Sequence, residues 1–272
     1  MAAGAARIVY VGHSTVLVEM NGVRLLTDPL LRPRLLHLRR VGEVPAHVLG
    51  GVDAVLISHL HFDHLDFPSL LELGRDVPVV VPRGAGGLVE GKGFSSVTEL
   101  GVGDELAVGE LAIRTTPALH PAGRTLFGRR AEPMGYVIDG SCSVYFAGDT
   151  DIFDGMASLG TIDIALVPIW GWGPHLGPGH LNPRAAAEAV RRIGAPTAIP
   201  IHWGTYFPLH TALRRRPAFL ETPAREFEGH MRKIAPEVEV RVLHPGEEAL
   251  FEKPRAGARP AAENFSADDV RH

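Results

Sequence analysis

Short apolar runs bounded by turn residues dominate the first third of this 272-residue chain. Their β-branched content predicts strands at 8–11, 15–19, 23–27, 54–58 and 77–81. Met20-Asn21-Gly22 separates the second run from the third, which predicts a hairpin, and 68–73 has the length and spacing of a short helix. The chain is therefore expected to begin as an antiparallel sheet and to continue through a β-α-β step.

The remainder of the chain mixes strand-like and helix-like segments without a strict order. Further strands are predicted at 111–116, 135–139, 143–147, 164–168, 198–201 and 238–243. The clearest helix spans 183–193, with Asn182 as N-cap and Pro183 at its first position, and another is predicted over 217–234. Residues 30–47 show no clean period and are interpreted as an irregular excursion.

This mixture predicts an α/β (α+β) fold, a four-layer αββα sandwich in which two mixed β-sheets are flanked by helices. No repeat at a fixed period is visible in the sequence. We expect one domain over residues 1–253, followed by a polar, Ala- and Pro-rich tail over 254–272 that is disordered.

Composition narrows the classes of partner and of metal site. The formal net charge of -4 gives no strong nucleic-acid signal. There is no transmembrane stretch and no signal-peptide core, so a cytoplasmic protein is expected, and leucines within 30–49 allow a homo-oligomer contact. The one cysteine, Cys142, alternates with apolar residues and is predicted to lie in the core, so a metal site here needs imidazole and carboxylate ligands.

Four residues that can bind metal ions follow the predicted strand at 54–58: His59, His61, Asp63 and His64. In an extended segment the side chains at i and i+2 point the same way, so His59 and His61 can bind one ion together. A tightening turn can direct Asp63 and His64 toward a second ion. Four such residues within six positions are hard to explain as surface decoration.

Three further candidates also follow predicted strands, namely His120, Asp149 and His202. Loops at the ends of strands on one rim of a sandwich converge, so residues distant in sequence can share a site. An isolated histidine such as His120 or His202 is more often a hydrogen-bonded polar residue than a ligand. The cluster at 59–64 favours the interpretation that these isolated candidates are also metal ligands.

The motifs around these residues resemble those of a known family. SHLHFDHLD resembles the His-x-His-x-Asp-His signature of the metallo-β-lactamase superfamily. GHST at 12–15, TDP at 27–29, AGDT at 147–150 and PIHWGT at 200–205 are similar to the branch that contains ascorbate-6-phosphate lactonase and N-acyl phosphatidylethanolamine phospholipase D-like hydrolases. The likeness runs from about residue 8 to about residue 210.

The resemblance implies a metal-dependent hydrolase with two divalent metal ions, Zn²⁺ in the first place and Mn²⁺ or Fe²⁺ as alternatives. It assigns His59, His61 and His120 to the first ion, Asp63, His64 and His202 to the second, and Asp149 to a bridge between them. TPALHP at 116–121 lacks the TPGHTxG sequence of the lactam- and thioester-cleaving branches. This departure favours phosphodiesterase or lactonase activity on a small-molecule or lipid-like substrate.

Such a pair of ions would activate a bridging water as hydroxide, which would attack a phosphodiester, phosphorylated lactone or related ester. Asp63 is expected to orient this nucleophile or to take its proton. His180, in GPGHLNP, is the candidate proton donor to the leaving group, and an ordinary role near the start of the following helix is equally open.

Several other residues have two interpretations that the sequence leaves open. Asp28 either contacts a ligand histidine or belongs to the turn before Pro29. Asp66 either contacts a ligand histidine or is the N-cap of the helix before Pro68. His13 either lies near the site or supports a hairpin. Trp170 either lines a pocket or packs in the core, and the sequence assigns no role to His175, Arg124 or the 30–47 loop.

Two other function classes compete with hydrolysis. A di-iron oxidoreductase could use the same ligand types, but no flavin-binding or electron-transfer segment supports it. A non-catalytic metal-binding protein of the same fold is the other alternative, although all seven ligand positions are filled.

Overall fold

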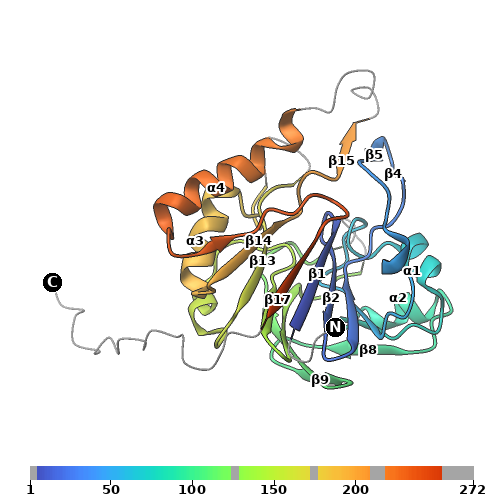
Figure 1. Ribbon diagram of the computed structural model, residues 1–272. Helices are drawn as coiled ribbons and strands as arrows, with labels where there is room; N and C mark the ends of the chain where they lie inside the picture. The colour runs from blue at the N-terminus through green and yellow to red at the C-terminus, as the bar shows by residue number, and fades with distance from the viewer. Residues whose placement is uncertain (1–4, 124–128, 172–176, 209–217, 253–272) are drawn as a thin grey trace.

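Two seven-stranded mixed β-sheets form the centre of the computed structural model, which describes residues 5–123, 129–171, 177–208 and 218–252. One sheet is built mostly from the first hundred residues and the other from the middle and later part of the chain. Helices lie on both sides of the pair of sheets (Figure 1). This arrangement confirms the predicted fold class.

The first sheet contains the predicted hairpin and the predicted β-α-β step. Its order is β17 (Glu248–Glu252), β1 (Ala5–Gly12), β2 (Thr15–Met20), β3 (Val23–Thr27), β6 (Ala54–Leu56), β7 (Val79–Pro82) and β8 (Val97–Leu100). Neighbours from β17 to β3 are antiparallel, and those from β3 to β8 are parallel.

The second sheet has the same pattern, three antiparallel pairs followed by three parallel pairs. Its order, from the antiparallel edge, is β9 (Glu105–Val108), β10 (Leu111–Pro117), β11 (Met134–Asp139), β12 (Ser143–Phe146), β13 (Ile164–Pro168), β14 (Thr197–Ile201) and β16 (Glu239–Val240). The two sheets are therefore alike in topology, although the sequence shows no repeat.

Side-chain alternation along the strands explains why the sheets and helices form layers. In β6 and β7, Leu56 and Val80 face the core shared with the second sheet, whereas Val55 and Val79 belong to an outer cluster with Leu70. Leu70 lies on α1 (Phe67–Leu73), and α2 (Gly86–Glu90) covers the same outer face. On the other side of the molecule, α3 (Pro183–Ile193) and α4 (Thr222–Ile234) pack against each other and α3 contacts β13 (Figure 1).

Helix α3 follows its sequence signals closely. It has the predicted bounds, and the Asn182 side chain accepts a hydrogen bond of 2.9 Å from the backbone N–H of Ala185. The predicted helix over 217–234 is instead a 3₁₀ turn, Ala218–Leu220, followed by α4. The predicted strand at 238–243 shortens to the two residues of β16. The sequence did not predict α2, β8, β9 or β17.

Residues 30–47 are more regular than expected. They contain β4 (Arg34–Leu35) and β5 (Leu38–Arg40), and β5 pairs with β15 (Tyr206–Pro208) in a small third sheet. Two further 3₁₀ turns span Ala46–Val48 and Asp154–Ser158. Because β5 and β15 are far apart in sequence, no local pattern could indicate this pairing.

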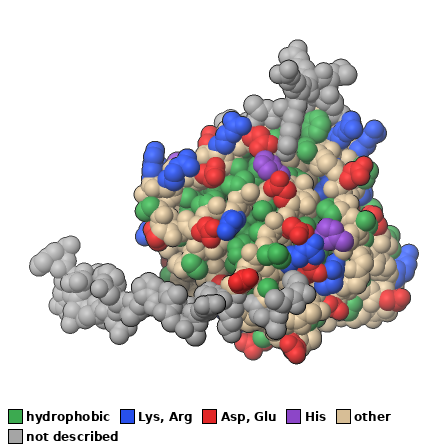
Figure 2. Space-filling view, viewed as in Figure 1, with side chains coloured by type: hydrophobic (Ala, Val, Ile, Leu, Met, Phe, Trp, Pro, Cys, Tyr) green, Lys and Arg blue, Asp and Glu red, His purple; other side chains and the backbone are tan. Residues whose placement is uncertain are grey.

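On the face shown in Figure 2, acidic and basic side chains are interspersed, as the small net charge suggests. None of the helices in the described ranges is long and apolar enough to cross a membrane. The predicted tail at 254–272 lies outside the described residues, so the domain boundary at 253 stays a prediction.

Candidate metal centre

The loops after four strands bring all seven predicted ligands to one end of the two sheets. The strands β6, β10, β12 and β14 precede His59, His120, Asp149 and His202 respectively, and β1 precedes a further histidine, His13. Glycine permits one close approach: Gly148 has φ +60°, and a Cβ there would lie 2.7 Å from Cβ of Ser58. The loop that carries Asp149 therefore lies directly against the end of β6.

Three imidazoles form the first group, His59, His61 and His120. Nδ1 of His61 lies 3.0 Å from Nε2 of His59 and 3.0 Å from Nε2 of His120. His59 and His61 come from the one loop after β6, whereas His120 arrives from the second sheet. The spacing argument for His59 and His61 thus holds, and the structure adds the third nitrogen.

The outer nitrogens of these rings show which tautomers are present. The Ser58 hydroxyl donates its one hydrogen to Oδ2 of Asp28 at 2.5 Å, so its oxygen accepts from Nδ1 of His59 at 2.9 Å. Nδ1 of His120 donates to the carbonyl of Gly179 at 2.7 Å. In the neutral rings, Nε2 of His59 and of His120 are therefore unprotonated and direct lone pairs toward Nδ1 of His61.

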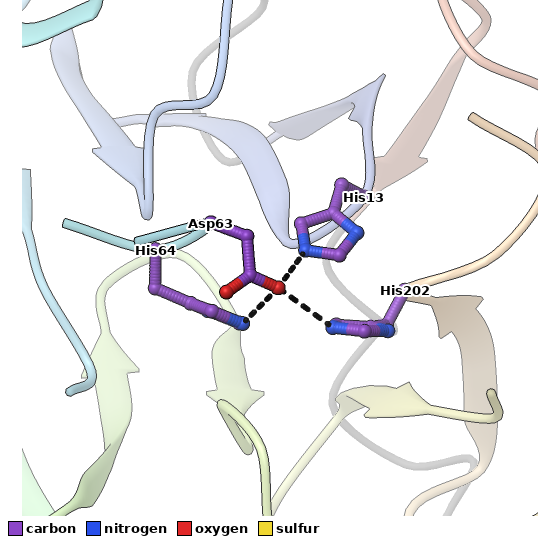
Figure 3. A group of neighbouring side chains, drawn as sticks. All are labelled: His13, Asp63, His64 and His202. Atoms are coloured by element: carbon purple, nitrogen blue, oxygen red, sulfur yellow. Dashed lines mark hydrogen bonds and ion pairs between the residues drawn. The ribbon is translucent and has the colours of Figure 1, made fainter. Parts of the chain in front are cut away.

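The second group contains one carboxylate and three imidazoles, His13, Asp63, His64 and His202 (Figure 3). Oδ2 of Asp63 lies 3.0 Å from Nε2 of His13, 3.6 Å from Nε2 of His64 and 4.0 Å from Nε2 of His202. The His13 ring also packs 3.9 Å from the His202 ring, centroid to centroid. His13 therefore lies in the site, which the sequence left open.

Asp149 lies between the two groups. Its Oδ2 is 3.3 Å from Nε2 of His64 and 3.3 Å from Nε2 of His202. Its carboxylate also lies within 4.8 Å of the ligand nitrogens of His120 and His180. It is thus within reach of both groups, as the predicted bridge would have to be.

Burial and neighbouring charge keep most of these groups in the forms that bind metal ions. Burial lowers the pKa of His59 well below its usual value, that of His120 to about 4 and that of His13 to about 3. Burial would raise the pKa of Asp63, but the charge of His64 and the hydrogen bond from His13 hold it well below its usual value. Neutral imidazole and ionised carboxylate are what metal ligation requires.

His64 behaves differently because three carboxylates surround it. Burial lowers its pKa, but Asp149, Asp63 and Asp28 together raise it well above the usual value. Nδ1 of His64 lies 2.7 Å from Oδ2 of Asp28 and donates to it. The carboxylates thus create a negative potential that a divalent cation would neutralise in place of the proton.

Two buried polar atoms support a fit to metal ions. Within the described residues, Oδ1 of Asp149 is buried without a hydrogen-bond partner, and Nε2 of His64 is buried between the carboxylates of Asp149 and Asp63, at 3.3 and 3.6 Å. Leaving buried polar atoms unsatisfied costs free energy, and such atoms are rare unless a ligand, water or ion completes them. Together with the converging lone pairs of the first group, they show that the donor set fits divalent cations.

Backbone conformation fixes the second group as well. His13 and His202 have positive φ, 58° and 62°, a conformation that is rare for residues other than glycine. The N–H of His202 donates to the carbonyl of His13 at 2.7 Å, and the N–H of His13 donates to Oγ1 of Thr205 at 2.6 Å. These bonds join the end of β1 to the end of β14, one strand from each sheet.

The structure decides several of the interpretations left open above. Asp28 is buried against Ser58 and His64, as a support of the ligand histidines. Asp66 is the N-cap of α1 and accepts from the N–H of Ser69 at 3.1 Å. Cys142 is buried in the core, and burial raises the pKa of its thiol to about 12.

His180 and Trp170 line a pocket that also includes Asp63, so both lie beside the site. Nε2 of His180 is 3.8 Å from Oδ2 of Asp149, and its Nδ1 donates to the carbonyl of Gly177 at 3.2 Å. Arg124 and His175 lie outside the described residues. His13 is the residue that sequence reasoning undervalued, and its position directly after a strand, like every other candidate, was the available signal.

Comparison with known proteins agrees with this geometry. A family model described as a beta-lactamase superfamily domain matches residues 23–203. The chain is 32% identical over 259 residues to a metal-dependent hydrolase of Rubrobacter xylanophilus, covering 90% of this chain and 96% of that protein. It is 30% identical to an N-acyl-phosphatidylethanolamine-hydrolyzing phospholipase D of Saccharomyces cerevisiae, over 72% of this chain and 47% of the yeast protein.

Solved structures show the same fold. The structure of Igni18, a metallo hydrolase of the archaeon Ignicoccus hospitalis, superposes with a TM-score of 0.68 at 23% identity, covering 91% of this chain and 99% of that one. The family match extends over more than half of the chain and includes the 59–64 cluster, Asp149 and His202. The chain therefore belongs to the beta-lactamase superfamily and is one of its metal-dependent hydrolases.

Proposed function

We propose that this protein hydrolyses a phosphodiester, a phosphorylated lactone or a related ester at a centre of two divalent ions. The observation that carries the proposal is the position of Asp149, whose carboxylate lies 3.3 Å from nitrogens of His64 and His202 and within 4.8 Å of His120. One carboxylate that reaches two separate ligand groups is what a dinuclear centre requires.

The spacing of these side chains supports the division of ligands that the family resemblance implies. In this proposal His59, His61 and His120 hold one ion, Asp63, His64 and His202 hold the other, and Asp149 contacts both. Nitrogen and oxygen donors without thiolate suit Zn²⁺, Mn²⁺ or Fe²⁺, and we propose Zn²⁺. His13 holds the Asp63 carboxylate through the 3.0 Å contact between its Nε2 and Oδ2.

When bound, two such ions lower the pKa of water and polarise the bond to be cleaved. Asp63 borders the pocket and is held ionised by its imidazole neighbours, so its carboxylate can accept a hydrogen bond from the attacking water and orient it. His180 lines the same pocket, and its Nδ1 donates to the carbonyl of Gly177. Its Nε2 would therefore pass a proton to the leaving oxygen from the doubly protonated imidazolium form, which returns the ring to the neutral form.

The bond class is supported by two observations. The yeast relative is named for hydrolysis of a phospholipid phosphodiester. In addition, TPALHP at 116–121 differs from the motif of the lactam- and thioester-cleaving branches. A di-iron oxidoreductase is supported by the fold alone, since the di-iron beta-hydroxylase CmlA of Streptomyces venezuelae superposes with a TM-score of 0.68 at 22% identity. No observation on the described residues favours a non-catalytic binding protein.

The test is metal analysis of the purified chain by mass spectrometry, followed by assays with bis(p-nitrophenyl) phosphate and a panel of lactones. We expect about two ions per chain and cleavage of at least one of these substrates. His61→Ala should remove activity, whereas His230→Ala, a histidine on α4 outside the site, should retain it. Metal-loaded protein that cleaves none of these substrates would overturn the proposal.

A further inference from the structure

A large pocket opens directly beside the candidate metal centre. It has a volume of about 1340 Å³, and Asp63 and His180 lie at its wall. Pockets for small ligands usually span roughly 300–1,000 Å³. A small polar substrate would therefore leave most of this pocket filled with water.

The walls of this pocket are mainly apolar and come from distant parts of the chain. Leu35, Leu36 and Leu38 of the β4–β5 hairpin lie on one wall, and Trp170, Phe219 and Pro223 contribute elsewhere. Trp170 and Phe219 contact each other with ring centroids 6.1 Å apart. Water against such walls is unfavourable, whereas an apolar ligand that displaces it gains the hydrophobic contribution.

Two apolar side chains of the lining are unusually exposed. Leu36 is 88% exposed and Phe62, within the ligand loop, is 53% exposed. Leu36 also has φ 50° in the two-residue turn between β4 and β5, which is costly for a residue with a branched side chain. Leu36 and Phe62 therefore offer apolar surface to the pocket.

The charged groups of the lining disfavour a second anionic group on the substrate. Among the described lining residues Arg32 is the one arginine or lysine, and its Nη2 donates to Oδ1 of Asp66 at 2.8 Å. Glu226 of α4 adds a negative charge. A phosphate placed in this pocket, away from the metal ligands, would meet one cation that is already paired.

We propose that the substrate of this hydrolase carries a long or bulky apolar group, which the pocket between the β4–β5 hairpin and α4 binds while the cleaved bond lies beside Asp63 and His180. This inference rests on the proposed function, because it names the substrate class of that same site. It excludes small phosphorylated sugars as the preferred substrates.

The test is a series of alkyl p-nitrophenyl phosphodiesters with methyl, butyl and octyl groups, assayed with the metal-loaded full chain. Each buried methylene contributes a factor of about two to four, so kcat/KM should rise at least about 100-fold from methyl to octyl. Leu36→Ser and Phe219→Ser should reduce this ratio by about tenfold or more. Leu250→Ser, which alters a 65% exposed leucine on β17 outside the pocket, should keep the wild-type ratio.

Calorimetric binding of octyl phosphate and methyl phosphate to the metal-loaded chain separates this inference from the proposed function. Tighter binding of octyl phosphate by about 100-fold or more supports the apolar pocket even if no phosphodiester is cleaved. Cleavage of the series with equal kcat/KM at every chain length would overturn the inference and leave the proposed function standing. Equal binding of the two phosphates would overturn it as well.

Discussion

The two ligand groups of the metal centre differ in what holds them in place. The first group is three imidazoles with nitrogens 3.0 Å apart, oriented by single contacts to Ser58 and Gly179. The second contains a carboxylate and depends on two histidines with positive φ, His13 and His202, whose backbones are bonded to each other. Local geometry therefore accounts for His59 and His61 of the first group, whereas His120 and the second group depend on the two sheets meeting correctly.

Asp149 links these groups, so its removal should have the largest effect. We expect Asp149→Ala to reduce kcat/KM by about 10³-fold or more and to weaken the binding of both ions. His61→Ala should reduce activity similarly but remove about one ion per chain. Metal content and kcat/KM of the two variants measure this difference. Loss of only one ion in Asp149→Ala would mean that this carboxylate belongs to one group alone.

Asp28 supports both groups at once, through Ser58 toward His59 and directly through His64. Asp28→Asn keeps the size but cannot accept all three hydrogen bonds with the same strength. Changes of this kind typically cost about 10- to 100-fold in metal affinity or activity. Chelator competition should show both ions weakened to a similar extent. An unchanged affinity for either ion would contradict this shared role.

The side-chain contacts of His13 described above are all with the second group, so its replacement should separate the two. His13→Asn retains a residue that tolerates positive φ but removes the contact to Oδ2 of Asp63. We expect a loss of about tenfold in affinity for one ion, with the other unchanged, because Asp63 loses its positioning partner. Stepwise metal titration by calorimetry would measure both affinities. Equal weakening of both ions would show that the groups are not independent.

Asp66 provides the contrast to Asp28, since it follows the same motif but caps α1 and pairs with Arg32. Asp66→Ala should lower the free energy of unfolding by about 1 kcal/mol through the lost N-cap. Metal content should stay the same, because Asp66 contacts no proposed ligand in the described contacts. Urea denaturation and metal analysis would test this pair of expectations.

The sequence predicted the pair His59 and His61 better than the place of His13, because the pair depends on local geometry and His13 depends on the contact between the two sheets. The spacing of His59 and His61 sets the direction of both side chains within one extended segment. His13, in contrast, is a single histidine after a hairpin strand, and nothing local indicates that it meets His202 from the other sheet. Asp63 was predicted as a site residue. Its contact with His13, however, forms only because β1 and β14 meet at this end of the two sheets.

The fold shows the same division between local and distant signals. Helix α3 has its predicted bounds, and its start was marked in the sequence by Asn182 and Pro183. Strand β17 was not predicted, because its pairing with β1 joins Ala5 to Glu252. The pocket beside the site could not be predicted either, since its walls come from segments far apart in sequence, such as the β4–β5 hairpin and α4.

The distribution of ligands between the sheets has a mechanical consequence. His59, His61, Asp63 and His64 follow a strand of the first sheet, whereas His120, Asp149 and His202 follow strands of the second. Any ion bound by either group is therefore a cross-link between the two sheets. Metal binding energy then becomes resistance to unfolding, which grows as RT ln(1 + [L]/Kd) with the free ion concentration. Removal of metal would therefore weaken the contact between the two sheets at the same place where the substrate is expected to bind.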